Sequence, residues 1–202
     1  MMIVEFNGKD NIGREDERQI AMIVKEAFKE KLEWFYKGMD KSKMQLLIEK
    51  SITYNLGFYY VEDGEILGVT LLATKGKKYL SNRKEITKHM KLWNGVMYKL
   101  SFSDFGLKAN ELNLGMIAVC PNARGKGIGK KMLSHVYVTA IREQKDTITL
   151  DVINTNIDVK RLYEKEGFKE STYLSTHLFT KGMGFTGLSI MKKTLDRSSS
   201  AT

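Results

Sequence analysis

Apolar residues recur at helical spacing in two segments near the start of the chain. In the first, Arg14–Tyr36, they fall every three or four residues, and three carboxylates occupy the first turn, where they favour the helix dipole. The second, Lys41–Tyr54, carries its apolar residues on one face. Residues 2–6 precede both segments and have the pattern of a short strand. The chain is therefore predicted to open with a strand and two helices.

The spacing changes to a strand pattern after residue 56. Segments 57–61 and 65–74 are rich in β-forming residues, and the Asp63-Gly64 pair between them is a strong hairpin signal. The pattern then predicts, in order, a strand at 111–119, a helix from 128 to about 144, a strand at 147–153, a helix at 157–166 and strands near 170–179 and 186–192. This mixed order favours an α/β (α+β) fold with helices packed on a largely antiparallel sheet. We expect residues 1–195 to form one domain and residues 196–202 a polar tail.

The net charge of the chain is +9, and it is concentrated in two places. A basic insert, residues 75–108, carries +7, and residues 124–131 carry +4, so the rest of the chain is slightly acidic. Charge clustered in this way indicates an anionic ligand. Nucleic acid is not the expected partner, because the sequence has neither a helix-turn-helix pattern nor basic residues interleaved with aromatic ones.

The counts of cysteine and histidine exclude several classes of site. One Cys forms no internal disulfide or cysteine-based zinc cluster, and the three His residues are scattered, so no metal is expected. Cys120 has no His or Asp at an activating spacing and is interpreted as a buried small residue.

The longest strictly apolar runs have five residues, too few to span a membrane, and the first residues lack the features of a signal peptide. We therefore expect a cytoplasmic protein that does not act at a membrane.

Three alternate glycines lie where a predicted strand passes into an amphipathic helix. Gly125, Gly127 and Gly129 let the backbone approach a ligand closely, and the free N–H groups of a helix N-terminus attract anions. Basic residues at 124, 126, 130 and 131 add positive charge. The loop is thus predicted to hold a pyrophosphate, although its spacing fits neither a P-loop nor a dinucleotide fingerprint. A purely structural turn before a cationic helix is the alternative.

Residues 118–129, Ala-Val-Cys-Pro-Asn-Ala-Arg-Gly-Lys-Gly-Ile-Gly, resemble the acyl-CoA binding motif of the GNAT superfamily of N-acyltransferases. That motif is written Arg/Gln-x-x-Gly-x-Gly/Ala. Residues 156–168 are similar to a second block of the family, Asn-x-x-Ala-x-x-Leu-Tyr-x-Lys-x-Gly-Phe, with Val159 in place of Ala. The resemblance implies a GNAT-like fold of order β-α-α-β-β-(insert)-β-α-β-α-β-β. It also implies acetyl-CoA as co-substrate and acetyl transfer to a primary amine of a small molecule or peptide, by direct attack in a ternary complex.

The resemblance also implies roles for single residues. The phosphates of coenzyme A are expected on the loop and the pantetheine arm beside the strand that precedes it, with the N–H of Val119 as the oxyanion donor. Asn156 is expected near the pantetheine, and Tyr163 is expected to protonate the departing thiolate, with a core aromatic as its alternative. The expected CoA-binding residues are Ile117, Ala118, Val119, Arg124, Gly125, Lys126, Gly127, Ile128, Gly129, Lys130 and Asn156.

The general base has two candidates. Glu111 lies 13 residues before Arg124, a spacing that resembles histone-type members of the family, whose strand glutamate deprotonates lysine through water. Asp151 lies five residues before Asn156, where some peptide N-terminal acetyltransferases carry Glu. We favour Glu111 and keep Asp151 as the alternative. The remaining interpretation is that both are ordinary strand carboxylates and that water or the backbone takes the proton.

The basic insert is expected beside the acceptor site, because the superfamily places this connection there. We expect it to form a cationic wall that favours an acidic small molecule or peptide over a polyamine. A solvated helix face, or a homodimer interface that uses Trp93 and Met97, is the alternative. The alternative function is a non-catalytic GNAT-fold module that binds acyl-CoA or an acidic partner.

Overall fold

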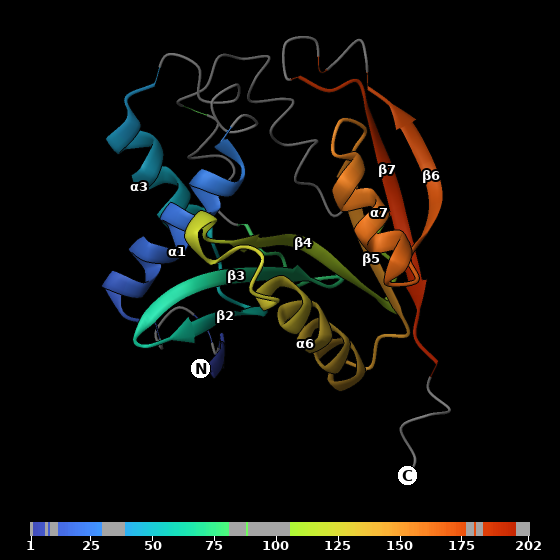
Figure 1. Cartoon of the computed structure of the whole chain (residues 1–202), viewed down its shortest axis with the longest axis horizontal. Helices are drawn as coiled ribbons and strands as arrows, with labels where there is room; N and C mark the ends of the chain where they lie inside the picture. The colour runs from blue at the N-terminus through green and yellow to red at the C-terminus, as the bar shows by residue number, and fades with distance from the viewer. Residues whose placement is uncertain are drawn as a thin grey trace.

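A computed structural model of the chain describes residues 2–6, 8, 12–29, 39–80, 88, 106–176, 180 and 184–196 (Figure 1). Its elements are β1 (Met2–Glu5), α1 (Arg14–Ala27), α3 (Lys41–Ser51), β2 (Gly57–Glu62), β3 (Glu65–Ala73), β4 (Glu111–Val119), a 3-10 turn η2 (Pro121–Ala123), α6 (Ile128–Arg142), β5 (Thr147–Ile153), α7 (Ile157–Lys165), β6 (Lys169–Ser175) and β7 (Gly187–Thr194). This sequence of elements confirms the predicted order.

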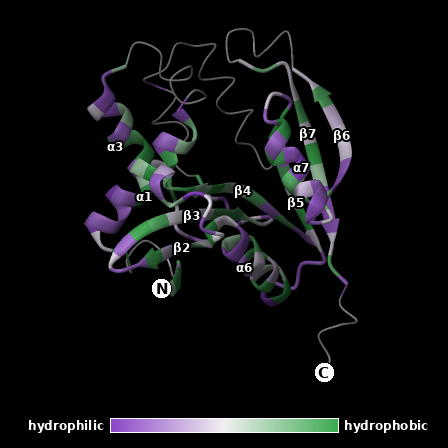
Figure 2. Ribbon diagram, in the orientation of Figure 1, coloured by the Kyte–Doolittle hydropathy of each residue, from purple (hydrophilic) through white to green (hydrophobic). Residues whose placement is uncertain are grey.

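The strands form one seven-stranded sheet in the order β1-β2-β3-β4-β5-β7-β6. Every neighbouring pair is antiparallel except β4 with β5, which is parallel, so the predicted largely antiparallel sheet is confirmed. One apolar cluster joins the sheet to α1 and α3, and a second joins it to α6 and α7. In Figure 2 the hydrophobic colour runs along the middle strands of the sheet, between these helices.

Local sequence signals place the ends of several elements. Asp40 caps α3, since its carboxylate accepts the N–H groups of Ser42 (2.9 Å) and Lys43 (3.1 Å). Asp63 and Gly64 both have positive φ, as a two-residue hairpin turn requires, so the hairpin prediction is confirmed. Pro121 starts η2 one residue after Cys120 makes the last bond to β3, so its missing N–H costs no ladder bond.

Two helices end before the residue that the apolar spacing predicts. α1 ends at Ala27, and residues 30–36 of the predicted helix lie outside the described residues. α3 ends at Ser51 rather than at Tyr54, because Ile52 pairs with Leu80 as an isolated β-bridge and Tyr54 has a φ of 52°. A tertiary contact such as the Ile52–Leu80 bridge cannot be predicted from helical spacing alone.

Most of the basic insert, with Trp93 and Met97, lies outside the described residues, as does its hypothesised wall. Residues 75–80, 88 and 106–108 are described. Within the described ranges, no helix is long and apolar enough to cross a membrane.

Candidate active site

Strands β4 and β5 are paired only at their first residues. The parallel pairs are Glu111 with Thr147, Leu112 with Ile148 and Asn113 with Thr149, and none follows. Beyond the last pair the two strands diverge, as Figure 1 shows. We call the point beyond Asn113 and Thr149 the fork. No described strand pairs with the β5 side of β4 after the fork, so a ligand can form hydrogen bonds with the backbone there.

A β-bulge at Gly115 changes which way β4 faces just beyond the fork. Leu71 of β3 pairs with Met116 and Leu72 with Leu114, which leaves Gly115 as the extra residue. Before the bulge, Leu112 and Leu114 belong to the cluster under α6 and α7. After it, Met116 and Ala118 belong to the cluster of α1 and α3, while Ile117 and Val119 pack against the α6 cluster.

Successive residues of β4 turn their N–H groups to opposite edges of the strand, and this decides where Val119 points. Cys120 donates its N–H to Leu67 of β3 at 2.8 Å, so Val119, one residue earlier, turns its N–H and carbonyl toward the β5 side. Ile117, two residues before Val119, has the same orientation. The Nε of Arg124 donates to the Val119 carbonyl at 3.3 Å. The N–H groups of Ile117 and Val119 therefore point toward the space between the diverging strands.

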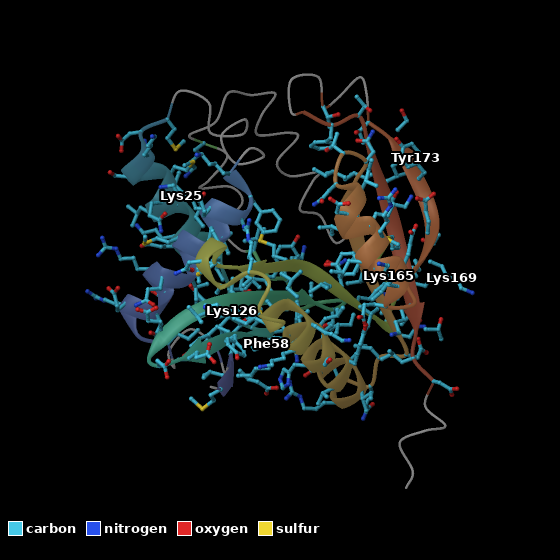
Figure 3. The ribbon with its side chains drawn as sticks, in the orientation of Figure 1. Lys25, Phe58, Lys126, Lys165, Lys169 and Tyr173 are labelled. Carbon is cyan, nitrogen blue, oxygen red and sulfur yellow. The ribbon has the colours of Figure 1, made fainter. Side chains whose placement is uncertain are left out.

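The glycine-rich loop forms the N-terminus of α6 with a backbone that only glycine adopts easily. Gly125 and Gly127 both have a φ of 78°, and Gly127 is the N-cap of α6, with no side chain bonded to the cap. The first helical bond comes from Lys131 to the Gly127 carbonyl (3.1 Å), so the N–H groups of residues 128–130 have no helical acceptor. Arg124, Lys126 and Lys130 are exposed around them. Figure 3 shows Lys126 beside the start of α6.

Asn156 and Tyr163 come from α7, which follows β5. Asn156 is the N-cap of α7, but its exposed side chain makes no capping bond and so can contact a ligand. Tyr163 is 7% exposed in the cluster under α6 and α7, and its ring meets Phe168 edge-on at 5.5 Å between centroids. Burial raises the pKa of Tyr163 to about 12, so its phenol is protonated at neutral pH.

The two candidate bases lie in different surroundings. Asp151 is exposed on β5, two residues beyond the last β4–β5 pair. Glu111 lies in the first of those pairs, and its carboxylate is 5% exposed. It accepts the Lys108 N–H at 3.0 Å and forms an ion pair with Lys192 Nζ at 2.6 Å. The structure thus brings Asp151 to the fork but not Glu111.

The environment of Glu111 is that of a structural ion pair. Burial raises the pKa of Glu111, but the Lys108 N–H and the Lys192 ammonium outweigh it and hold the pKa below its usual 4.5. Since the lowered pKa stabilises the folded state, that stability is present above pH 4.5 and is lost as the pH falls through the folded-state pKa.

Glu111→Gln is expected to lower the free energy of unfolding at pH 7 by about 1–3 kcal/mol, because Lys192 loses its partner. Urea unfolding at pH 7 and pH 4 measures this. The difference in the free energy of unfolding between the wild type and Glu111→Gln should be smaller at pH 4. The activity proposed below should stay within about two-fold of the wild type in the folded variant. A stable variant with a large loss of activity would contradict the structural role.

Cys120 lies outside the fork, on the α1 side of β4. It lines a shallow, mostly apolar hollow of about 250 Å³, together with Gln19, Met22, Ile23, Glu26, Ile66 and Pro121. Burial raises the pKa of the Cys120 thiol, which disfavours the nucleophilic thiolate. Among the described residues, no group of three or more potential metal ligands occurs.

Two features of the site were not predicted from the sequence. Asn154 ties the end of β5 to the start of β7: its Oδ1 accepts the N–H groups of Thr186 (3.1 Å) and Gly187 (3.3 Å). No sequence pattern marks this contact. The second feature is Tyr79, whose ring packs on Gly115. An isolated glycine inside an apolar strand is a known signal for a bulge or a close approach, and Gly115 is both.

A family model described as an acetyltransferase (GNAT) domain matches residues 55–170. This range is more than half of the chain and contains the fork, the glycine-rich loop and α7. A comparison with curated proteins finds no match.

Solved structures share the arrangement at low identity. One described as an acetyltransferase is 21% identical with a TM-score of 0.62, over 97% of this chain and 100% of that chain. The ribosomal-protein-S18-alanine N-acetyltransferase from Escherichia coli is 16% identical with a TM-score of 0.56, over 100% of this chain and 97% of that chain. A Bacillus subtilis acetyltransferase in complex with CoA is 14% identical with a TM-score of 0.57, over 96% and 99%. At these identities the likeness shows the fold.

Proposed function

We propose that this chain, which belongs to the GNAT family of acetyltransferases, transfers an acetyl group from acetyl-CoA to a primary amine of a small molecule or peptide. The observation that carries the proposal is the fork. Beyond it no described strand pairs with the β5 side of β4, and β4 leads directly into a cationic loop whose N–H groups at the start of α6 have no helical acceptor. This arrangement offers donors for both the thioester and the phosphates of one extended donor molecule.

The pyrophosphate would bind the N–H groups of residues 128–130, with Arg124, Lys126 and Lys130 around it. The pantetheine arm would lie along β4, paired with the backbone of Ile117 and Val119, in place of the strand that β5 does not supply there. The bound CoA of the Bacillus subtilis relative is consistent with this use of the shared fold.

The reaction follows from these positions. A neutral amine attacks the thioester carbonyl, and the Val119 N–H donates to the oxyanion that forms. Asp151 takes a proton from the attacking nitrogen, directly or through water. The tetrahedral intermediate collapses with cleavage of the C–S bond, and the Tyr163 phenol gives its proton to the thiolate. Asp151 then gives its proton to solvent, Tyr163 regains one from solvent, and the amide and free coenzyme A leave.

Asp151 is our choice of base over Glu111 because of their surroundings. The Glu111 carboxylate is held by Lys192 and the Lys108 N–H at the paired end of the strands, whereas Asp151 is exposed beyond the fork. A base must reach the proton that it removes, and only the second position offers that reach.

The experiment that tests the proposal measures free thiol after mixing the protein with acetyl-CoA and each of a panel of amines. The panel contains a small alkylamine, an aromatic amine, a polyamine, an acidic amino acid and a peptide with a free N-terminus. Amine-dependent release of thiol, with an acetylated product by mass spectrometry, supports the proposal. Tight CoA binding without transfer to any amine would instead indicate a non-catalytic acyl-CoA module.

Tyr163→Phe tests the proposed acid. We expect kcat to fall by roughly ten-fold or more, with little change in the KM for acetyl-CoA or for the amine. The ring and its packing on Phe168 remain, while the proton donor is lost. Steady-state kinetics at several pH values measure this. If kcat is unchanged, Tyr163 is a core aromatic, and the thiolate leaves without its help.

A further inference from the structure

We propose that Tyr79 is an acceptor-binding residue whose ring forms one wall of the site where the amine approaches the thioester. The inference rests on the proposed function and adds a specificity-determining residue to it. It comes from three observations: where the ring lies, what lies across the fork from it, and how its backbone is held.

The Tyr79 ring lies directly on the backbone of β4 at the bulge. A Cβ placed on Gly115 would overlap Cε1, Cζ and Cδ1 of the ring, so only glycine admits this contact. Tyr79 packs against the cluster on the α1 and α3 side of the sheet and is half-buried, so the protein does not enclose the residue completely. The Tyr79 ring thus occupies the space that a side chain on Gly115 would fill.

Asp151 and Gly115 lie equally far beyond the last β4–β5 pair. That pair is Asn113 with Thr149, and each of the two residues follows it by two positions on its own strand. Leu150 and Val152 belong to the cluster under α6 and α7, so Asp151 lies on the opposite face of β5. Tyr79 packs on that same face of the sheet. An aromatic ring and a carboxylate therefore flank the fork on one face.

The backbone of Tyr79 is fixed on both sides. Its carbonyl accepts the N–H of Thr53 at 3.1 Å, and Leu80 pairs with Ile52. The Thr53 hydroxyl donates to the carbonyl of Lys78 at 2.5 Å. The ring is therefore a preorganised surface that needs no ordering when a ligand binds.

The Tyr79 ring and the Asp151 carboxylate would both attract an amine in its protonated form. The face of an aromatic ring attracts a cationic nitrogen, and a carboxylate opposite the ring adds to that attraction. An acceptor would reach the fork as an ammonium between Tyr79 and Asp151 and lose one proton to solvent there. The neutral amine then attacks, and Asp151 takes the proton of the attacking nitrogen. A ring wall also favours an acceptor whose amine is carried on an apolar or aromatic group.

Steady-state kinetics of Tyr79→Ala and Gly115→Ala test the proposal, with phenethylamine and ethylamine as the acceptors. Both variants should raise the KM for phenethylamine by about ten-fold, the first by removing the ring and the second by displacing it. The KM for acetyl-CoA should stay within two-fold. Tyr79→Phe keeps the ring and should match the wild type. Tyr173→Ala is the matched control, because Tyr173 also covers a glycine, Gly187, but lies on the edge strand β6 (Figure 3).

The outcomes separate the two proposals. If the wild type transfers acetyl groups and both variants keep the wild-type KM for phenethylamine, the inference about Tyr79 is overturned and the proposed function stands. If the wild type binds CoA but acetylates no amine, the proposed function fails and the inference fails with it. Thermal melts accompany each assay, and Tyr79→Leu replaces Tyr79→Ala if the latter does not fold, with the same expected rise in KM.

Discussion

Replacing Gly129 by aspartate is expected to weaken binding of acetyl-CoA by roughly a hundred-fold while the protein keeps its fold. Gly129 is the second residue of α6, and a Cβ there would meet only Val119 Cγ2, at an ordinary 3.9 Å. A carboxylate in the first turn of a helix favours the helix dipole, so the change does not destabilise α6. It does place a negative charge where the pyrophosphate would bind.

Gly129→Asn and Gly129→Ala are the matched controls, since they add bulk without charge. Isothermal titration with coenzyme A should give a Kd within about five-fold of the wild type for both. Raising the salt concentration should recover part of the affinity of the aspartate variant, because salt screens the repulsion. Equal affinity for the aspartate and asparagine variants would mean that the phosphates bind elsewhere.

Asp151→Asn is expected to lower kcat by roughly a hundred-fold at neutral pH, the size of effect that a lost general base produces. The KM for acetyl-CoA should change little. Steady-state kinetics at neutral pH with one good acceptor measure both the kcat and the KM for acetyl-CoA.

Glu111→Gln serves as the comparison for that experiment. Both variants replace a carboxylate by an amide of the same shape, but Glu111 lies at the paired end of β4, bonded to Lys192. We expect Asp151→Asn to lose activity and Glu111→Gln to lose stability. The reverse result would return the base to Glu111 and require the paired end of the strands to open in the complex.

Much of the fold is predictable from the sequence, because the signals for most of its helices, strands and turns lie in residues close together in the chain. The hairpin turn at Asp63-Gly64, the alternation of strand residues and the glycine-rich start of α6 all depend on neighbours in the sequence. The order of elements and the sheet follow from them. The end of α3 does not, because it depends on the bridge from Ile52 to Leu80, nearly thirty residues away.

The site is only partly predictable for a related reason. The loop and α7 carry motif residues at fixed spacing, so their neighbourhood could be anticipated. The surroundings of Glu111 could not, because Lys192 comes from the last strand and lies 81 residues away in the chain. Gly115 and Asp151 both lie two residues beyond the last β4–β5 pair, which depends on the parallel register and on where it stops, and local spacing predicts neither.

One measurement tests the central claim, that the fork and the glycine-rich loop together hold an acetyl donor for transfer to an amine. The protein is mixed with acetyl-CoA labelled in the acetyl group, with and without the amine panel, and thiol release and label transfer are followed together. We expect thiol release that depends on the amine, an equal amount of label in the amide product, and loss of both in Gly129→Asp. Binding of acetyl-CoA with no labelled amide for any amine would contradict the claim.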